Sequence, residues 1–231
     1  MKAANYPVLR PIADTGVLVE FGDSINDDTH QKVLDFDVAI TAASLAGFIQ
    51  STPSFTAVLV SYDPLKTDYE LVCEHIEKHL SSENHERSKT THWQIPVCYA
   101  EPLAPDLLEL ADKLSLSTDE VIEQHSRGRY KIYMFGFAPG YAYMGGVPDA
   151  IQIPRKQAPV MNVPQKTVMI AGPQCLITTL PMPTGWWRIG MTTQNPLQLS
   201  KEQPFQFGVG DTIEFLPMSE REYRAHNSEN T

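Results

Sequence analysis

Residues 136–146, with the sequence GFAPGYAYMGG, form the stretch of the chain with the most unusual composition. Its glycines would let a ligand approach the backbone closely, and N–H groups exposed between them can hold an anion. The structural alternative, which composition alone favours, is a loop whose glycines only permit positive φ. The spacing excludes a Walker A loop, because no Gly-Lys-Ser/Thr follows, and GxGxxG is absent. The candidate binding residues of this stretch are Gly136, Phe137, Gly140, Tyr141, Tyr143, Gly145 and Gly146.

Cationic and aromatic side chains that could accompany this loop lie further along the chain. Arg155 precedes Lys156 in a segment between two prolines, which stiffen the backbone. A guanidinium held rigidly suits a carboxylate or a phosphate, although a solvated surface pair is an equally good interpretation. Lys166 and Arg188 are cationic candidates of the same kind. Trp186, close to Arg188, either lines a pocket or belongs to the core.

Few side chains in this sequence indicate acid–base, nucleophilic or metal chemistry. His125 could act as a general base, but a lone histidine near a helix end more often complements the helix dipole. Cys175 has no neighbouring base in the sequence, so a small buried thiol is the better interpretation. His75 and His79 share one helix face, yet no third ligand and no HExxH pattern accompany them. We therefore expect no metal bound by the protein itself.

Charge and composition exclude several classes of protein. The chain has 231 residues and a net charge of −10, which argues against nucleic-acid binding and against docking on an anionic membrane. No run approaches the ~18 apolar residues of a membrane helix, and no signal peptide is visible. The three cysteines favour reduced thiols in a cytoplasmic protein. Residues 127–188 contain seven Lys or Arg and a single Asp, so this basic segment (+6) predicts a small anion or an acidic partner surface.

The first part of the chain is predicted to be a small α+β domain. Strands are expected at 16–22 and 55–62, and the apolar spacing predicts helices that begin near Asp27 and Tyr69. Residues 81–91 contain no apolar side chain, which indicates a linker. We therefore place the domains at 1–85 and 86–231.

The second part is predicted to be mainly β-structure. A capping box at Ser117–Glu120 begins one helix. Many short strands with turn signals favour a closed or nearly closed barrel. Gly210-Asp211 is expected to form a tight hairpin turn, and residues 219–231 a frayed polar tail. The expected helix before the capping box is 106–114, and the expected strands are 93–99, 129–137, 168–171, 176–178, 205–209 and 212–216.

A series of short motifs occurs in an order that resembles the allophanate hydrolase subunit 1 family, which includes the 5-oxoprolinase B-subunit and kinase inhibitors of the Kip type. The resemblance extends from about Gly16 to Met218, and each motif alone is weak evidence. The motifs are Ile132-Tyr133-Met134, Gly136-Phe-Ala-Pro-Gly-Tyr141, Tyr143-Met-Gly-Gly146, Pro154-Arg155, Val163-Pro164, Ile170-Ala-Gly172, Gln174, Gly185-Trp186 and Ile189-Gly190.

The resemblance implies an N-terminal α/β domain and a C-terminal cyclophilin-like β-barrel. It implies one subunit of an ATP-dependent amide or lactam hydrolase, with 5-oxoprolinase, which opens 5-oxoproline to L-glutamate, as the first expectation. The expected partners are a subunit 2 protein and a third oxoprolinase subunit, and the expected cofactor is ATP, with Mg²⁺ bound to it. The implied catalytic residues are His125, Arg155 and Gln174, and the implied binding residues are those of the glycine loop with Lys166, Trp186 and Arg188.

Two alternatives remain open. One is a protein-binding module that inhibits a sensor histidine kinase. The other is a carboxyltransferase-type subunit related to urea or allophanate metabolism, although the chain shows no biotin attachment motif.

The chain also departs from the family pattern. Val160, Asn162 and Met191 stand where the family usually has arginine, and Thr184 stands where it usually has glycine. We expect most of these departures to lie in the cleft, where each lost charged hydrogen bond is worth about 1.5–3 kcal/mol. Three consequences are open: a different ligand, a site located mainly on the partner, or a non-catalytic relative.

Overall fold

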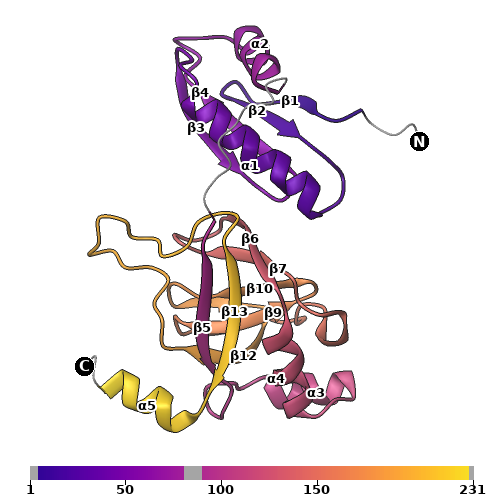
Figure 1. Cartoon of the computed structure of the whole chain (residues 1–231), viewed down its shortest axis with the longest axis vertical. Coiled ribbons are helices and arrows are strands. Elements are labelled where there is room, and N and C mark those ends of the chain that lie inside the picture. Colours follow the sequence, from indigo (N-terminus) through magenta and orange to yellow (C-terminus); the bar gives the residue numbers. More distant parts are fainter. Residues whose placement is uncertain (1–4, 81–89, 229–231) are drawn as a thin grey trace. The chain divides into compact units, whose positions relative to one another are not determined.

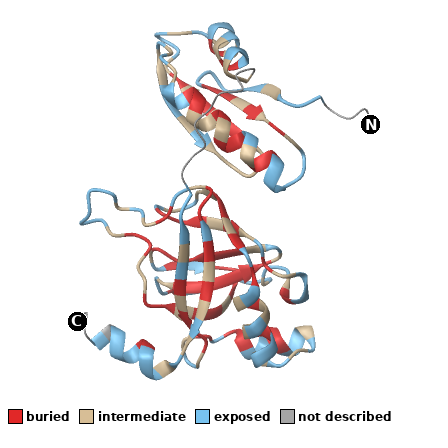
Figure 2. Cartoon of the chain, in the orientation of Figure 1, coloured by how far each residue is buried: buried red, intermediate tan, exposed pale blue. Residues whose placement is uncertain are grey.

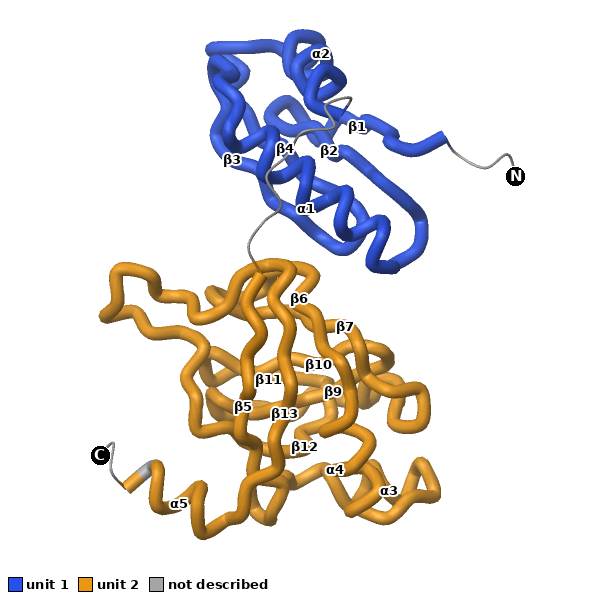
Figure 3. Tube along the Cα trace, viewed as in Figure 1, with its two compact units in different colours: residues 1–89 blue, residues 90–231 orange. Residues whose placement is uncertain are grey.

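The computed structural model describes residues 5–80 and 90–228. It separates into two compact units, residues 1–89 and 90–231 (Figure 3). The boundary predicted between residues 85 and 86 lies in the segment 81–89, outside the described residues.

The first unit is a four-stranded antiparallel sheet, in the order β1-β2-β4-β3, with two helices (Figure 1). Alternate residues of the central strands, such as Val17 and Val58, share one core with Val33 and Ile76 of the helices. The first helix begins where predicted because the Asn26 side chain accepts a 2.8 Å hydrogen bond from the Thr29 amide. The elements are β1 Val8–Ile12, β2 Gly16–Glu20, α1 Asp27–Ala42, β3 Phe48–Pro53, β4 Ala57–Tyr62 and α2 Tyr69–Leu80.

The second unit is a closed barrel of seven strands in the order β10-β7-β6-β13-β5-β12-β9. Its strands are β5 His92–Cys98, β6 Tyr130–Phe135, β7 Ala142–Gly145, β9 Thr167–Ala171, β10 Gln174–Ile177, β12 Trp187–Thr192 and β13 Thr212–Met218. Outside the barrel are α3 Leu107–Leu114, α4 Thr118–Arg127, the 3-10 turn η1 Asp149–Ile151, the strand pair β8 Val160–Val163 and β11 Met182–Thr184, and α5 Glu220–Ser228. The predicted fold class, an α+β unit followed by a mainly β barrel, is confirmed.

Burial follows these elements closely (Figure 2). One continuous core fills the barrel, and Ile95, Met144 and Leu176 from three of its strands are fully buried in it. The predicted capping box at Ser117 and Glu120 is present at the start of α4. Among the described residues, no helix combines the length and hydropathy needed to cross a bilayer.

The strand predicted at 205–209 is wrong, and so is the hairpin at Gly210-Asp211. A single bridge between Leu197 and Phe205 is the only β-pairing of that segment. The physical reason lies in β13, which pairs in parallel with β5 along its full length and antiparallel with β6 at its start. Both edges of β13 are therefore occupied at its start, where a hairpin partner would have to pair.

The prediction of a frayed tail is wrong for residues 220–228, which form α5. Ser219 and Glu222 make a reciprocal capping box, in which the Ser219 amide donates to Glu222 at 2.8 Å and the Glu222 amide donates to Ser219 at 3.3 Å. Tyr223 is buried, so one side of this otherwise polar helix packs on the barrel unit.

Candidate functional site

A cavity of about 420 Å³ opens on the barrel unit between the glycine loop, the segment before β8 and the β11–β12 connection. It brings together six of the candidate residues: Phe137, Tyr141, Tyr143, Arg155, Gln174 and Trp186. The other lining residues, which the sequence did not single out as site residues, are Pro154, Ala171, Gly172, Pro183 and Thr184.

Aromatic rings form one wall of this cavity. The ring centroids of Phe137 and Tyr141 are 5.6 Å apart, those of Tyr141 and Tyr143 are 5.5 Å apart, and those of Tyr143 and Trp186 are 6.1 Å apart. Tyr141 and Trp186 are buried, whereas Phe137 is 76% exposed. Burial raises the pKa of both tyrosines, so their hydroxyls are neutral donors. The wall suits a flat or cyclic ligand.

Arg155 supplies the positive charge of the cavity. Its side chain is exposed, and among the described residues it has no ion-pair partner. A Cβ placed on Gly185 would lie 3.7 Å from Arg155 Nε, so the guanidinium packs close to the backbone there. The positive charge of Arg155 acts on Tyr141 and Tyr143 and opposes part of the rise in their pKa that burial causes. Arg155 can therefore pair with one carboxylate or one phosphate group.

Gln174 adds an amide to the cavity because of strand pairing. It opens β10, where it is paired with Gly145 of β7 on one side and with Ala171 of β9 on the other. Side chains alternate along a strand, and Cys175, the next residue, is fully buried in the barrel core. Within the described part of the chain, the Gln174 amide makes no side-chain hydrogen bond, so it can donate to and accept from a ligand.

The predicted loop glycines shape the site without lining the cavity. Gly146 has φ +112°, and a Cβ there would lie 2.0 Å from the Arg129 carbonyl oxygen. A Cβ on Gly145 would lie 2.7 Å from the Tyr133 ring, and Gly140 has φ +68°. Gly136 is half-buried and donates its amide to the Tyr141 carbonyl. These glycines permit the close packing that brings the aromatic residues between them to the cavity.

The structure does not bring Lys166, Arg188 or His125 into the cavity lining. Lys166 lies in the turn before β9 with φ +69°, and its amide donates to the Thr178 carbonyl at 2.7 Å. Arg188 forms an ion pair with Asp106. His125 is fully buried on α4, so its predicted role as a catalytic base has no access to a ligand in this cavity.

His125 belongs to the barrel core. Its ring stacks on Phe215 at a centroid distance of 4.6 Å, and its Nε2 lies 3.7 Å from Cys175 Sγ. Burial lowers the pKa of His125 to about 3 and raises that of the Cys175 thiol. Both groups are therefore neutral, which agrees with the interpretation of Cys175 as a buried thiol and gives no activated nucleophile.

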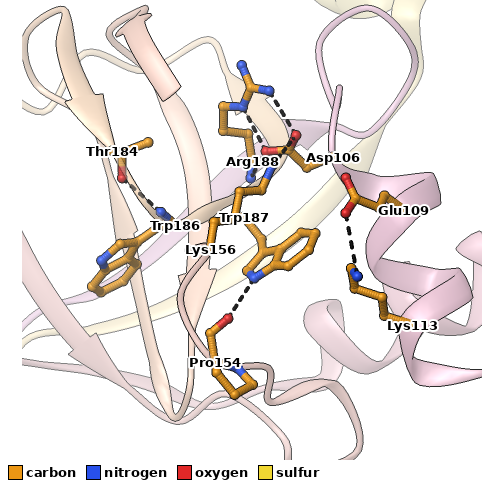
Figure 4. A network of polar contacts seen from close by, with 9 residues as sticks. All are labelled: Asp106, Glu109, Lys113, Pro154, Lys156, Thr184, Trp186, Trp187 and Arg188. Atoms are coloured by element: carbon orange, nitrogen blue, oxygen red, sulfur yellow. Dashed lines mark hydrogen bonds and ion pairs between the residues drawn. The ribbon is translucent and has the colours of Figure 1, made fainter. Parts of the chain in front are cut away.

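Asp106, which the sequence predicts only as the beginning of a helix, organises a cluster of polar contacts near the cavity (Figure 4). Its carboxylate lies 2.6 Å from Lys156 Nζ and receives two hydrogen bonds, at 2.7 and 2.8 Å, from the Arg188 guanidinium. Three of the seven cations of the basic segment are therefore paired with acids outside that segment, Lys156 and Arg188 with Asp106 and Arg127 with Glu123. Sequence spacing carries no signal for this contact, because Asp106 and Arg188 are 82 positions apart.

The structure shows where four departures from the family pattern lie. Thr184 lines the cavity, but Val160, Asn162 and Met191 do not belong to its described lining. They lie on β8 and β12. Of these four departures, only Thr184 therefore lines the cavity.

The two histidines of α2 lie close together without a third candidate ligand among the described residues. The rings of His75 and His79 are 4.4 Å apart, but their described surroundings hold no group of three His, Cys, Asp or Glu residues that could bind an ion. The same is true of the rest of the described chain.

Comparison with known proteins gives a consistent result. The pattern of the carboxyltransferase domain, subdomain C and D, matches residues 7–207. The 5-oxoprolinase B-subunit of Bacillus subtilis (strain 168) is 34% identical over 236 residues, covering 96% of this chain and 97% of the relative. The 5-oxoprolinase B-subunit of Escherichia coli O157:H7 is 26% identical over 212 residues, covering 90% and 95%. The crystal structure of TTHA0988 superposes with a TM-score of 0.78 and 27% identity over 91% of this chain, which corresponds to only 40% of that longer chain.

Proposed function

The chain belongs to the family of the carboxyltransferase domain, subdomain C and D, and we propose that it is a subunit of a 5-oxoprolinase, an ATP-dependent enzyme that opens 5-oxoproline to L-glutamate. The names of two relatives that match nearly the whole chain support this proposal. The observation that carries it is the cavity in which Arg155, Gln174 and an aromatic wall meet. We place the protein in the cytoplasm, in keeping with its three free thiols.

The proposed substrate matches the chemistry of this cavity. 5-Oxoproline is a small cyclic amide with one carboxylate. The exposed Arg155 guanidinium would pair with the carboxylate, and the Gln174 amide would hydrogen-bond the lactam. The rings of Tyr143 and Trp186 would pack against the apolar side of the lactam ring. A single cation facing a single negative charge leaves no charge unpaired.

We propose that ATP binds outside this cavity. A triphosphate requires several cations or backbone donors, and Arg155 is the one cationic side chain of the described lining. Lys166 and Arg188, the other proposed phosphate ligands, lie outside it, and Arg188 is paired with Asp106. We therefore assign ATP, with its Mg²⁺, to another subunit of the complex and propose that this chain contributes the substrate pocket.

A partner protein is part of the proposal. In TTHA0988 the region equivalent to this chain is joined to further polypeptide, since it makes up 40% of that chain. The two curated relatives are themselves named as subunits, which points in the same direction. We propose a subunit 2 protein as the direct partner and a third oxoprolinase subunit as a further member of the complex.

Calorimetric titration of the purified chain with 5-oxoproline tests the substrate pocket directly. Removal of the guanidinium by Arg155→Met is expected to weaken binding about tenfold or more, because one charge-assisted hydrogen-bonded pair is lost. The control is Lys131→Met, which removes a cation of the same basic segment outside the cavity. Glutamate release by the complex, reconstituted with the products of neighbouring genes, tests the reaction. A complete complex without turnover would contradict the proposal.

A protein-binding module is the second candidate, and one observation favours it. Phe137 is 76% exposed at the edge of the cavity and adopts φ +68°, a strained conformation for a residue with a side chain. An exposed aromatic residue held in this way suits contact with another protein. A pull-down with a sensor kinase, followed by an autophosphorylation assay, distinguishes this candidate from the enzyme.

A further inference from the structure

Asp106 occupies the N-cap of α3 but does not cap the helix. An aspartate at this position ordinarily accepts a hydrogen bond from an amide of the first helical turn. Here the side chain makes no such bond, and its carboxylate, only 5% exposed, turns to Lys156 and Arg188 instead. The helix forgoes a local stabilising contact, which indicates that the carboxylate serves another part of the molecule.

The contacts of Asp106 join two segments that supply the cavity. One oxygen accepts from the Arg188 amide at 2.9 Å and from Arg188 Nε at 2.7 Å, and the other accepts from Arg188 Nη2 at 2.8 Å and pairs with Lys156 Nζ at 2.6 Å. Lys156 directly follows Arg155, and Arg188 stands two positions after Trp186. One buried carboxylate therefore holds the neighbours of two cavity residues.

Three further contacts tie the same two segments together. The Lys156 amide donates to the Gly185 carbonyl at 2.8 Å, and the Trp187 indole nitrogen donates to the Pro154 carbonyl at 2.8 Å. Lys156 Nζ also lies 4.7 Å from the centroid of the Trp187 ring. Figure 4 shows these side chains converging between the 154–156 segment, β12 and α3. Arg155 itself has no such anchor among the described residues, so the position of its backbone depends on these neighbours.

We propose that Asp106 is a positioning residue, which clamps the 154–156 segment to β12 through Lys156 and Arg188 and so holds Arg155 at the cavity. The carboxylate does not touch the ligand. The role as a ligand-positioning residue depends on the proposed substrate pocket, whereas the clamp is a property of this chain alone.

The clamp is tested without any ligand. In ¹⁵N-tryptophan-labelled protein, the three indole N–H groups give separate signals, and the Trp187 group reports the bond to Pro154. In Asp106→Asn and in the milder Lys156→Met, we expect Trp187 indole exchange with solvent to become about tenfold faster or more. The Trp93 indole, which donates to Asp211 at 2.8 Å elsewhere in the barrel, should keep its rate. The matched controls are Asp112→Asn on α3 and Lys113→Met, whose ammonium lies 6.0 Å from the same Trp187 ring but does not reach Asp106.

The positioning role is tested by titration with 5-oxoproline. Asp106→Asn and Lys156→Met should each weaken binding, and neither should weaken it further when Arg155→Met is already present, since the clamp acts through Arg155. Unchanged Trp187 exchange in Lys156→Met, or equal acceleration of Trp93 and Trp187 in both variants, would overturn the proposal. If Asp106→Asn or Lys156→Met weakened 5-oxoproline binding further in the Arg155→Met background, that result would also overturn the proposal. If Arg155→Met alone binds 5-oxoproline as well as the unmodified chain, the proposed function fails, and Trp187 exchange still decides the clamp.

Discussion

The Tyr99 hydroxyl oxygen lies 2.8 Å from Nδ1 of His125 in the core of the barrel. Both side chains are buried, and Cys175 lies on the other side of the imidazole. Because His125 is buried in its neutral form, its contribution to the free energy of unfolding depends on pH.

The first prediction concerns that pH dependence. Burial lowers the pKa of His125 from 6.5 to about 3, so below pH 6.5 the unfolded chain takes up a proton that the folded chain does not. His125 therefore costs stability as the pH falls from about 6.5 towards 3, by at most about 1.4 kcal/mol per pH unit. His125→Gln should show a smaller loss of stability over this range than the unmodified chain. Urea unfolding at several pH values, followed by tryptophan fluorescence, measures the difference, because all three tryptophans lie in the barrel unit.

The exposed histidine of α5 provides the control for this experiment. His226→Gln should keep the acid sensitivity of the unmodified chain. Parallel stability curves for His125→Gln and the unmodified chain between pH 6.5 and 4 would show that His125 does not titrate as expected.

The second prediction concerns the glycine loop. A Cβ at Gly146 would lie 2.0 Å from a backbone oxygen at φ +112°, so Gly146→Ala should destabilise the barrel unit by about 3 kcal/mol or more, or prevent its folding. Gly172→Ala is the matched substitution, because φ is +54° and no atom lies within 4 Å of the added Cβ. It should cost only about 1–2 kcal/mol. Similar unfolding midpoints for the two variants in urea would refute the steric explanation.

The third prediction concerns Asp211, a buried carboxylate that accepts hydrogen bonds from the Thr91 amide at 2.7 Å, the Trp93 indole at 2.8 Å and the Gly208 amide at 2.8 Å. These bonds join the starts of β5 and β13, which pair in parallel. Asp211→Asn would place an amide N–H against one of the donors, and we expect a loss of about 2–4 kcal/mol. Urea unfolding measures the change, with the exposed Asp112→Asn as control. A loss no larger than that of the control would show that the three bonds contribute little.

The fourth prediction separates stability from binding at Phe137. Phe137→Gly relieves the strain of φ +68°, and the added freedom of glycine in the unfolded chain offsets that gain. The net change in stability should be below about 1 kcal/mol. Because the ring is exposed at the cavity, binding of 5-oxoproline or of a partner subunit should nevertheless weaken. Calorimetric titration with 5-oxoproline and with the partner subunit measures binding, and thermal unfolding of the same preparation measures stability. If Phe137→Gly bound both 5-oxoproline and the partner subunit as well as the unmodified chain does, Phe137 would not belong to the site.

The sequence determined those features that arise from interactions between near neighbours in the chain. The Ser117–Glu120 capping box and the Asn26 cap lie within three residues of the groups they bond, and the apolar stripe of α2 repeats every three to four residues. β4 lies within the predicted strand 55–62, whose β-branched and aromatic residues favour a strand. The capping box at Ser219–Glu222 was equally local, so the helical end of the chain could have been predicted and was missed.

Only the tertiary structure decided which candidate residues meet. Gln174 reaches the glycine loop because β10 pairs with β7, and Arg188 is withdrawn from the cavity because Asp106, 82 positions earlier, binds it. His125 is buried in the core because its ring stacks on Phe215 of β13 in the closed barrel. Each outcome depends on strand order and on pairings between distant segments, whose free energy comes from burial and hydrogen bonds that no local pattern records. The sequence therefore identified the types of residue that the site contains. Their grouping into one cavity, whose described lining has Arg155 as its one cationic side chain, required the closed barrel.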